Sequence, residues 1–209
     1  MLLSVLFENP MMFFVVIAGI VYALTIHEFA HAAVATALGD STAKFSGRLS
    51  LNPLVHLDMF GTMMLLLAGF GWGKPVPVNI FNLKYKRWGE SLVALAGPMA
   101  NFVSAILFIL LFKLAILFFP AENMIFSFLF YMILINLVLG VFNLIPLPPL
   151  DGSRILFATL PSRFDDFKHR FAVNGPWILI LLLIADSFLD VNIFGRIFGF
   201  FIDMIYFFI

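Results

Sequence analysis

The stretch "ALTIHEFAHAAV", residues 23–34, places two histidines and a glutamate inside a long apolar segment. The whole segment, residues 10–38, contains no other histidine and no other charged side chain. As a helix it would extend about 44 Å, which is enough to cross a bilayer with some tilt, and Gly39-Asp40 is a typical helix stop. Burying a charge among apolar groups costs free energy unless a partner binds it, so these three side chains predict a functional site.

The composition of the chain predicts an integral membrane protein. Its 209 residues are 63% hydrophobic and 11% charged, whereas soluble domains carry about 25% charged residues. The net charge is zero, so no nucleic-acid partner is indicated. The first residues lack the pattern of a cleaved signal peptide, so we expect the first apolar segment to be retained. There is no cysteine, which leaves His, Asp, Glu, carbonyl groups or water as metal ligands.

The apolar runs predict an all-α polytopic membrane protein with about five transmembrane helices. The last two runs could instead form a tight hairpin. The expected spans are residues 10–38, 91–119, 124–145, 172–187 and 194–209.

We expect a short β-hairpin or re-entrant element between the first two spans. Alternating residues around 45–51 favour short strands, and residues 59–70 are apolar but too short to span a bilayer. Residues 71–90 are predicted to form a loop. Within it "PVPVN" is expected to be extended, because proline disfavours a helical residue before it.

Prolines interrupt the later spans. Gly97-Pro98 is expected to interrupt the second span near its start, and "IPLPPLDG", residues 145–152, to end the third. A short interfacial helix is expected over residues 153–160.

Basic residues indicate the orientation. With an outside N-terminus, five spans place residues 40–58, 71–90 and 151–170 on one side, and these segments hold two, four and four of the twelve Lys and Arg residues. The opposite side has only Arg196. The positive-inside rule therefore makes the basic side cytoplasmic, and both "HEFAH" and "LDG" lie toward it.

The spacing of "HEFAH" predicts a metal site. His27 and His31 are four residues apart and share one face of a helix, where both can ligate one ion. Glu28 can then reach a water on that ion and act as a general base. Zinc would lower the pKa of its water to about 7.

A catalytic zinc needs a third protein ligand and an open position. Asp151 follows a long apolar segment and matches the depth of the histidines, although it could instead cap the helix that follows. His56, Asp58 and Glu90 are the competing candidates.

Together these motifs resemble the site-2 protease family of intramembrane zinc metalloproteases. "HEFAH" and "LDG" resemble that family's HExxH and LDG motifs, and "GPMAN", residues 97–101, resembles its GPxxN motif. HExxH alone occurs in many unrelated proteases, but three motifs in this order on apolar helices are specific. The remaining similar stretches are "NLIPLPPLDG" (143–152), "GRLSLNPLVHLDMFGT" (47–62) and "GWGKPVPVN" (71–79).

The resemblance covers about residues 15–160, which would be the catalytic core of a single domain over residues 1–209. A C-terminal helical pair, about 172–209, would gate substrate entry or complete the fold. The chain has no room for the PDZ module of larger relatives, so a compact prokaryotic-type member is implied.

Carried over by motif, His27, His31 and Asp151 become the ligands of one zinc ion per chain, and Glu28 becomes the catalytic base.

Three further residues are candidates for supporting the reaction. Asn101 and Asn143 match motif asparagines that could bond the substrate backbone or the developing oxyanion, or could pack helices. His56 could stabilise the transition state or hold its loop.

The implied activity is hydrolysis of peptide bonds in or near transmembrane segments of membrane proteins, in the bilayer of a prokaryotic cell with the site toward the cytoplasm. The substrate would unwind and pair with an edge at residues 44–51 or 74–79. A divalent-metal transporter and a non-catalytic binder of membrane proteins are the alternatives. The spans between the motifs hold almost no ionisable residue apart from Lys113, which opposes transport. The presence of Glu28 opposes the second alternative.

Overall fold

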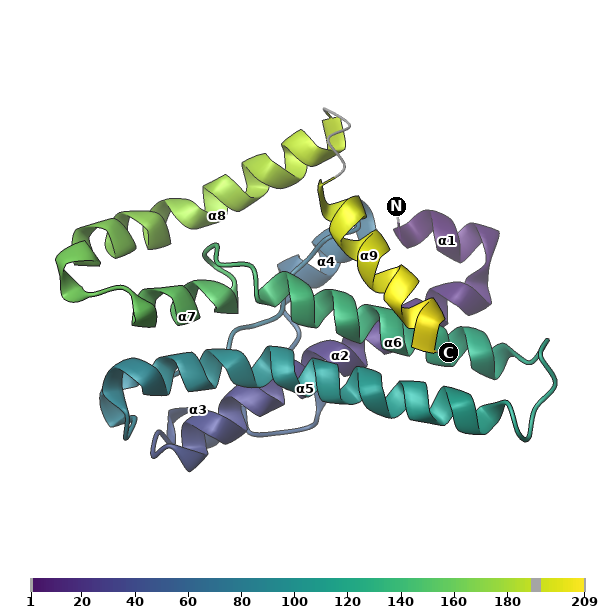
Figure 1. The fold of residues 1–209 in the computed structure, drawn as a ribbon, viewed down its shortest axis with the longest axis horizontal. Coiled ribbons are helices and arrows are strands. Elements are labelled where there is room, and N and C mark those ends of the chain that lie inside the picture. The colour runs from purple at the N-terminus through teal and green to yellow at the C-terminus, as the bar shows by residue number, and fades with distance from the viewer. Residues whose placement is uncertain (1, 189–192, 209) are drawn as a thin grey trace.

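The computed structural model describes residues 2–188 and 193–208, and the described chain is mostly helical (Figure 1). Three single-turn 3-10 helices accompany the α-helices: η1 (Pro53–Val55), η2 (Ile80–Asn82) and η3 (Ser162–Phe164). The α-helices are α1 (Leu2–Glu8), α2 (Pro10–Ala37), α3 (Thr42–Phe45), α4 (Met59–Ala68), α5 (Lys86–Ala115), α6 (Met124–Asn143), α7 (Asp151–Thr159), α8 (Asp165–Phe188) and α9 (Ile193–Phe208).

The first span forms as expected, with clear signals at both ends. Asn9 caps α2 by accepting the N–H of Met12 at 3.1 Å, and Pro10 takes the first helical position, where its missing N–H costs nothing. After the helix, Gly39 adopts a φ of 106°, a left-handed conformation that favours glycine. These signals place "HEFAH" in the C-terminal half of α2.

Helices α2, α5 and α6 pack against one another and form the centre of the molecule. Figure 1 shows α5 and α6 running side by side, with α9 crossing α6. The largest apolar core lies between α5 and α6 and includes Phe108, Met132 and Ile133, while Ile205 of α9 joins it. This three-helix centre is the scaffold on which the polar residues of the sequence motifs are placed.

The expected count of about five spans is wrong, because four helices of the described chain are long and apolar enough to cross a membrane. They fall within Pro10–Ala37, Trp88–Ala115, Met124–Asn143 and Ser162–Asp186. Helix α9 has only 16 residues, which is below the length that a transmembrane helix needs. The described chain is thus a multi-pass helical protein with four candidate spans.

The expected β-hairpin is also absent from the described residues, where the only β-type pairing is one isolated antiparallel bridge between Leu57 and Gly73. The chain instead begins a helical turn directly after Asp40, whose carboxylate accepts the N–H of Thr42 at 3.1 Å. Gly47 then turns the chain with a φ of 69°. Local bonding between the Asp40 side chain and the backbone therefore outweighs the alternation of residues that favoured strands.

Helix α4 is the short apolar element expected over residues 59–70. Asp58 caps it by accepting the N–H of Gly61 at 2.8 Å, and Gly69 ends it in a left-handed conformation. The helix contacts α1, which precedes α2. The chain therefore returns along α2 before it leads into α5.

The two proline motifs behave differently. Pro98 lies inside α5 without ending it, and its side chain is fully buried. The proline-rich stretch after α6 does end that helix, at Asn143, and a turn leads into α7. Helix α8 then lies against this turn, where Gly175 allows Pro148 to approach closely.

Candidate active site

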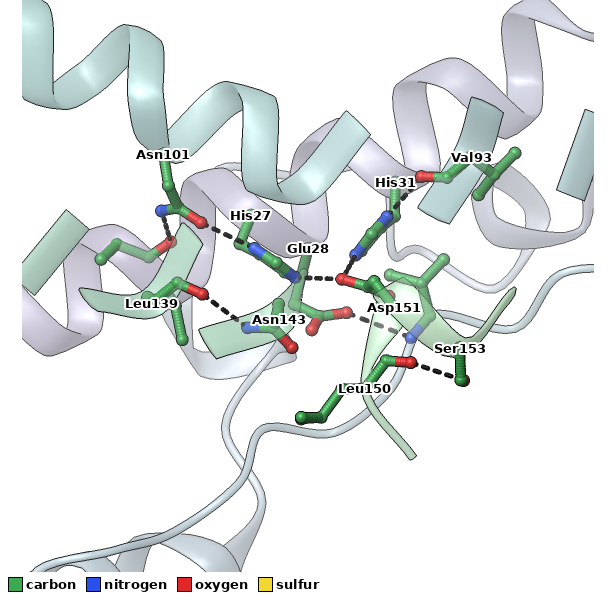
Figure 2. A network of polar contacts seen from close by, with 12 residues as sticks. His27, Glu28, His31, Val93, Asn101, Leu139, Asn143, Leu150, Asp151 and Ser153 are labelled. Carbon is green, nitrogen blue, oxygen red and sulfur yellow. Dashed lines mark hydrogen bonds and ion pairs between the residues drawn. The ribbon is translucent and has the colours of Figure 1, made fainter. Parts of the chain in front are cut away.

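The two histidines of α2 converge on one carboxylate from α7. The Nε2 atoms of His27 and His31 lie 3.0 and 3.2 Å from Oδ2 of Asp151, across 124 and 120 residues of sequence (Figure 2). One ligand atom from each residue lies within 4.8 Å of the others. In the part of the chain that the structure describes, this is the one group of three such side chains close enough to hold a metal ion.

The outer nitrogen of each ring faces an oxygen atom. Nδ1 of His27 lies 2.7 Å from Oδ1 of Asn101, and Nδ1 of His31 lies 2.7 Å from the carbonyl oxygen of Val93 (Figure 2). Because these oxygens can only accept, each Nδ1 carries the proton and each Nε2 presents a lone pair to Asp151. Two lone pairs and a carboxylate that face one another require a cation between them. The donor set therefore fits a divalent metal with three protein ligands.

Asp151 reaches the histidines because of how α7 begins. Leu150 occupies the N-cap position and Asp151 is the first helical residue, so its carboxylate is not used as a cap. Gly152 lies so close to the carbonyl of Leu144 that a Cβ atom would not fit there. Ligation of a metal ion requires the ionised carboxyl group, so Asp151 would serve as an anionic ligand.

Gly97 of α5 explains why the "GPMAN" stretch lies against this site. A Cβ atom at position 97 would lie 2.5 Å from Nε2 of His31 and 2.6 Å from Nε2 of His27. The absence of a side chain leaves room for both rings and for an ion at their inner edge.

Glu28 lies outside the donor group but faces the same cavity. Its Oε2 accepts the N–H of Val76 at 3.2 Å (Figure 2). The cavity has a volume of about 430 Å³, and both histidines, Glu28 and Asp151 line it. A water molecule and an extended peptide could enter this space together, since segment 72–78 forms one of its walls.

The two asparagines proposed to support the reaction have different surroundings. Asn101 is fully buried, and its amide donates to the carbonyl of Ala23 at 3.0 Å and to Oδ1 of Asn136 at 3.1 Å. Asn143 lines the cavity, with its amide nitrogen bonded to the carbonyl of Leu139 at 3.0 Å. The carboxamide oxygen of Asn143 has no protein partner among the described contacts, so it is available to a ligand.

None of the three competing candidates for the third ligand belongs to the donor group. His56 is fully buried in its loop, where Nε2 bonds the carbonyl of Ser50 at 2.7 Å. Asp58 caps α4. Glu90 lines the cavity but pairs with Arg154 at 2.6 Å, and it is not in the donor group.

Sequence reasoning missed several groups that shape the site. The carbonyl of Val93 and the N–H of Val76 are backbone atoms, which no motif identifies. Asn136 was the one detectable case, because a fully buried amide in the apolar helix α6 needs partners.

The fold and the donor set define a class of protein: a multi-pass helical membrane protein with a buried His-His-Asp group and an adjacent glutamate. Comparison with known proteins narrows this class. Residues 119–184 match the model described as "Peptidase family M50". No solved structure matches the chain significantly.

Curated relatives agree with this match. "Putative zinc metalloprotease YwhC" of Bacillus subtilis is 48% identical over 149 residues, which are 68% of this chain and 67% of the relative. "Putative zinc metalloprotease Rip2" of Mycobacterium tuberculosis is 32% identical over 193 residues, which are 90% of this chain and 71% of the relative. "Zinc metalloprotease MJ0392" of Methanocaldococcus jannaschii is 33% identical over 111 residues, which are 53% of this chain and 32% of the relative. The chain belongs to peptidase family M50, which confirms the resemblance to site-2 proteases.

Proposed function

We propose that this protein is an intramembrane zinc metalloprotease that hydrolyses peptide bonds in or near the transmembrane segments of membrane proteins. The observation that carries the proposal is that two unprotonated imidazole nitrogens and the Asp151 carboxylate converge on the wall of one cavity. Glu28 lines the same cavity. His27, His31 and Asp151 would hold the ion, which when bound would supply Lewis acidity and lower the pKa of the attacking water.

The chain supplies proton transfer and substrate alignment. Glu28 takes the proton of the attacking water and passes it to the amine that leaves. The carboxamide of Asn143, on the cavity wall, is placed to support the substrate or the developing oxyanion. Asn101 supports His27 from outside the cavity, and His56 holds its loop.

The substrate enters as an extended strand. A helical peptide bond has its carbonyl bonded and its faces shielded, so attack needs local unwinding. Of the two edges expected to receive the strand, residues 74–79 fit the role, since Pro75, Val76 and Val78 line the cavity. Residues 44–51 begin inside α3 and then turn, so they offer a poorer edge.

The protein is a single membrane domain of a prokaryotic cell membrane, with the site toward the cytoplasm. The loops at the site end of α2, α5 and α6 carry most of the basic residues.

Replacing the base tests the proposal. Glu28→Gln should bind zinc as the wild type does but lose at least about 100-fold in cleavage rate, because general-base catalysis contributes roughly that much or more. The assay is cleavage of a purified membrane-spanning peptide in detergent or liposomes, with and without a zinc chelator, beside metal analysis of both proteins. Full cleavage by Glu28→Gln, or chelator-resistant cleavage by the wild type, would refute the mechanism.

A further inference from the structure

A chain of buried amides leads from α6 to the metal-facing histidine. Asn136 is fully buried, and its Nδ2 donates to the carbonyl of Met132 at 2.8 Å. Its Oδ1 accepts Nδ2 of Asn101 at 3.1 Å, and Oδ1 of Asn101 lies 2.7 Å from Nδ1 of His27. Three helices thus share one continuous set of hydrogen bonds.

The direction of these bonds is fixed at the outer end. The carbonyl of Met132 can only accept, so the amide nitrogen of Asn136 must face it and the oxygen must face Asn101. Asn101 then turns its own nitrogen to Asn136 and its oxygen to His27. No hydroxyl group, which could donate in either direction, lies within this chain of bonds.

The second amide proton of Asn101 goes to the carbonyl of Ala23 at 3.0 Å. This bond favours the same orientation but uses only one of the two protons. Without Asn136 the other proton would be buried without a partner, which favours rotation or displacement of the Asn101 side chain.

We propose that Asn136 is a positioning residue for the metal centre: through Asn101 it fixes the tautomer of His27 with the proton on Nδ1, so that Nε2 is free to bind the ion. The inference rests on the proposed zinc site for its purpose, but the hydrogen bond from Nδ1 of His27 to Asn101 can be measured without metal. Asn136 neither lines the cavity nor belongs to the donor group, and its hydrogen bonds connect it to that group through Asn101.

The test uses two variants and one matched control. Asn136→Leu removes both polar partners. Asn136→Asp retains an acceptor for Asn101, and a buried neutral carboxyl can still donate to the carbonyl of Met132. Tyr22→Phe is the control, because Tyr22 and Ser104 make another hydrogen bond between α2 and α5, at 3.2 Å, that does not reach His27.

Two measurements are made on each protein. Ring nitrogen–proton spectra of histidine-labelled, metal-free protein show whether Nδ1 of His27 carries a hydrogen-bonded proton, whatever the state of Nε2 beside Asp151. Competition with a fluorescent chelator reports the dissociation constant for zinc. We expect Asn136→Leu to weaken or lose this Nδ1 proton signal and to bind zinc about tenfold more weakly, the lower end of losses seen for outer partners of metal ligands. Asn136→Asp and Tyr22→Phe should keep the Nδ1 proton signal and the wild-type zinc affinity.

An unchanged Nδ1 proton signal of His27 and an unchanged zinc affinity in Asn136→Leu would overturn the inference and leave Asn136 a helix-packing residue. Equal losses in Tyr22→Phe would do the same, since any weakened helix contact would then suffice. If Asn136→Leu does not fold, Asn136→Ala is measured against the same expectations. A wild-type protein that binds no zinc would refute the proposed function, whereas the ring nitrogen spectrum would still decide the role of Asn136.

Discussion

At the residue scale, the site depends on the positions of single side-chain and backbone atoms. Some of these could be predicted from the sequence and others could not. His27, Glu28 and His31 were predictable because four-residue spacing sets which side chains share a helix face. The partners that hold the rings were not, since they come from α5 and α6 and depend on how the helices pack. A backbone carbonyl such as that of Val93 has no residue identity to recognise.

Gly97→Ala should damage the metal site although alanine favours helices. The added methyl group would lie 2.5–2.6 Å from the Nε2 atoms of both histidines, and the rings cannot move away without losing their bonds to Asn101 and Val93. We expect zinc affinity to fall at least about tenfold, as when outer contacts of metal ligands are lost. Metal titration of the purified protein measures this.

Gly199→Ala is the matched control, because nothing lies near a Cβ atom at position 199. It should leave zinc affinity unchanged. If Gly97→Ala binds zinc like the wild type, Gly97 does not define the space at the histidines.

At the element scale, the segment over residues 72–79 is held from two sides. The guanidinium of Arg48, which is buried, donates through Nη2 to the carbonyls of Lys74 and Pro75. At the other end, Asp40 accepts the N–H of Asn79 at 2.7 Å. Between these attachments, Val76 donates its N–H to Glu28. The loop before α4 thus fixes the wall of the cavity that contacts Glu28.

Arg48→Met should reduce cleavage at least about tenfold, because the wall at residues 74–76 loses its anchor and misplaced active-site groups cost rate steeply. Zinc content should not change, since Arg48 contacts none of the donor residues. The specificity constant for a membrane-spanning peptide measures the effect. Lys44→Met removes an exposed charge from the same loop and serves as the control; equal losses in both variants would indicate a general charge effect.

Asp40→Asn should lower stability by about 1–3 kcal/mol at neutral pH, the usual cost of disturbing a buried hydrogen-bonded group. Burial opposes ionisation of Asp40, but bonds from Thr42, Asn79 and Asn82 hold its pKa below the ordinary value. Such a group stabilises the folded protein above its unfolded pKa of about 4, and the contribution is lost as the pH falls through the folded pKa. Wild-type stability should therefore decline at acidic pH more than that of Asp40→Asn.

Thermal unfolding in detergent across this pH range measures the difference. Asp165→Asn is the control, because that carboxylate is largely exposed beside Lys168. Parallel pH profiles for the wild type and Asp40→Asn would show that Asp40 gains nothing from its partners.

The element between the first two spans also shows where sequence reasoning fails. Alternation around residues 45–51 favoured strands, but the bond from the N–H of Thr42 to Asp40 and the turn at Gly47 direct the chain differently. Competing local signals of similar strength cannot be ranked without knowing which tertiary contacts each one allows. In contrast, the ends of α2 and α6 were predictable, because glycine and proline act there without competition.

At the scale of the whole molecule, apolar length predicted the architecture well but not the number of spans. Helices α2, α5 and α6 agree with expected spans to within a few residues, except that α5 begins at Lys86 rather than 91. The described part of the last expected span is as apolar as a span, but the helix that contains it, α9, has only 16 residues. Hydropathy reports composition, whereas crossing also requires length.

The absence of cysteine allows the orientation to be tested directly. Single substitutions Ser46→Cys and Glu122→Cys place a thiol at exposed positions on opposite sides of the molecule, after α3 and between α5 and α6. In intact cells we expect an impermeant maleimide to label Glu122→Cys at once and Ser46→Cys only after permeabilisation. The reverse pattern would put the site outside the cytoplasm.

The meeting of His27 and Asp151 joins two points of the chain that are 124 residues apart. A cation held there closes a very long loop, in the way that a covalent bridge does in secreted proteins. Closing such a loop is entropically costly, and that cost grows only slowly with its length. The same ion that activates water would thus also connect the end of the first span to the segment after the third. A chelator would therefore remove a structural cross-link as well as the catalytic ion.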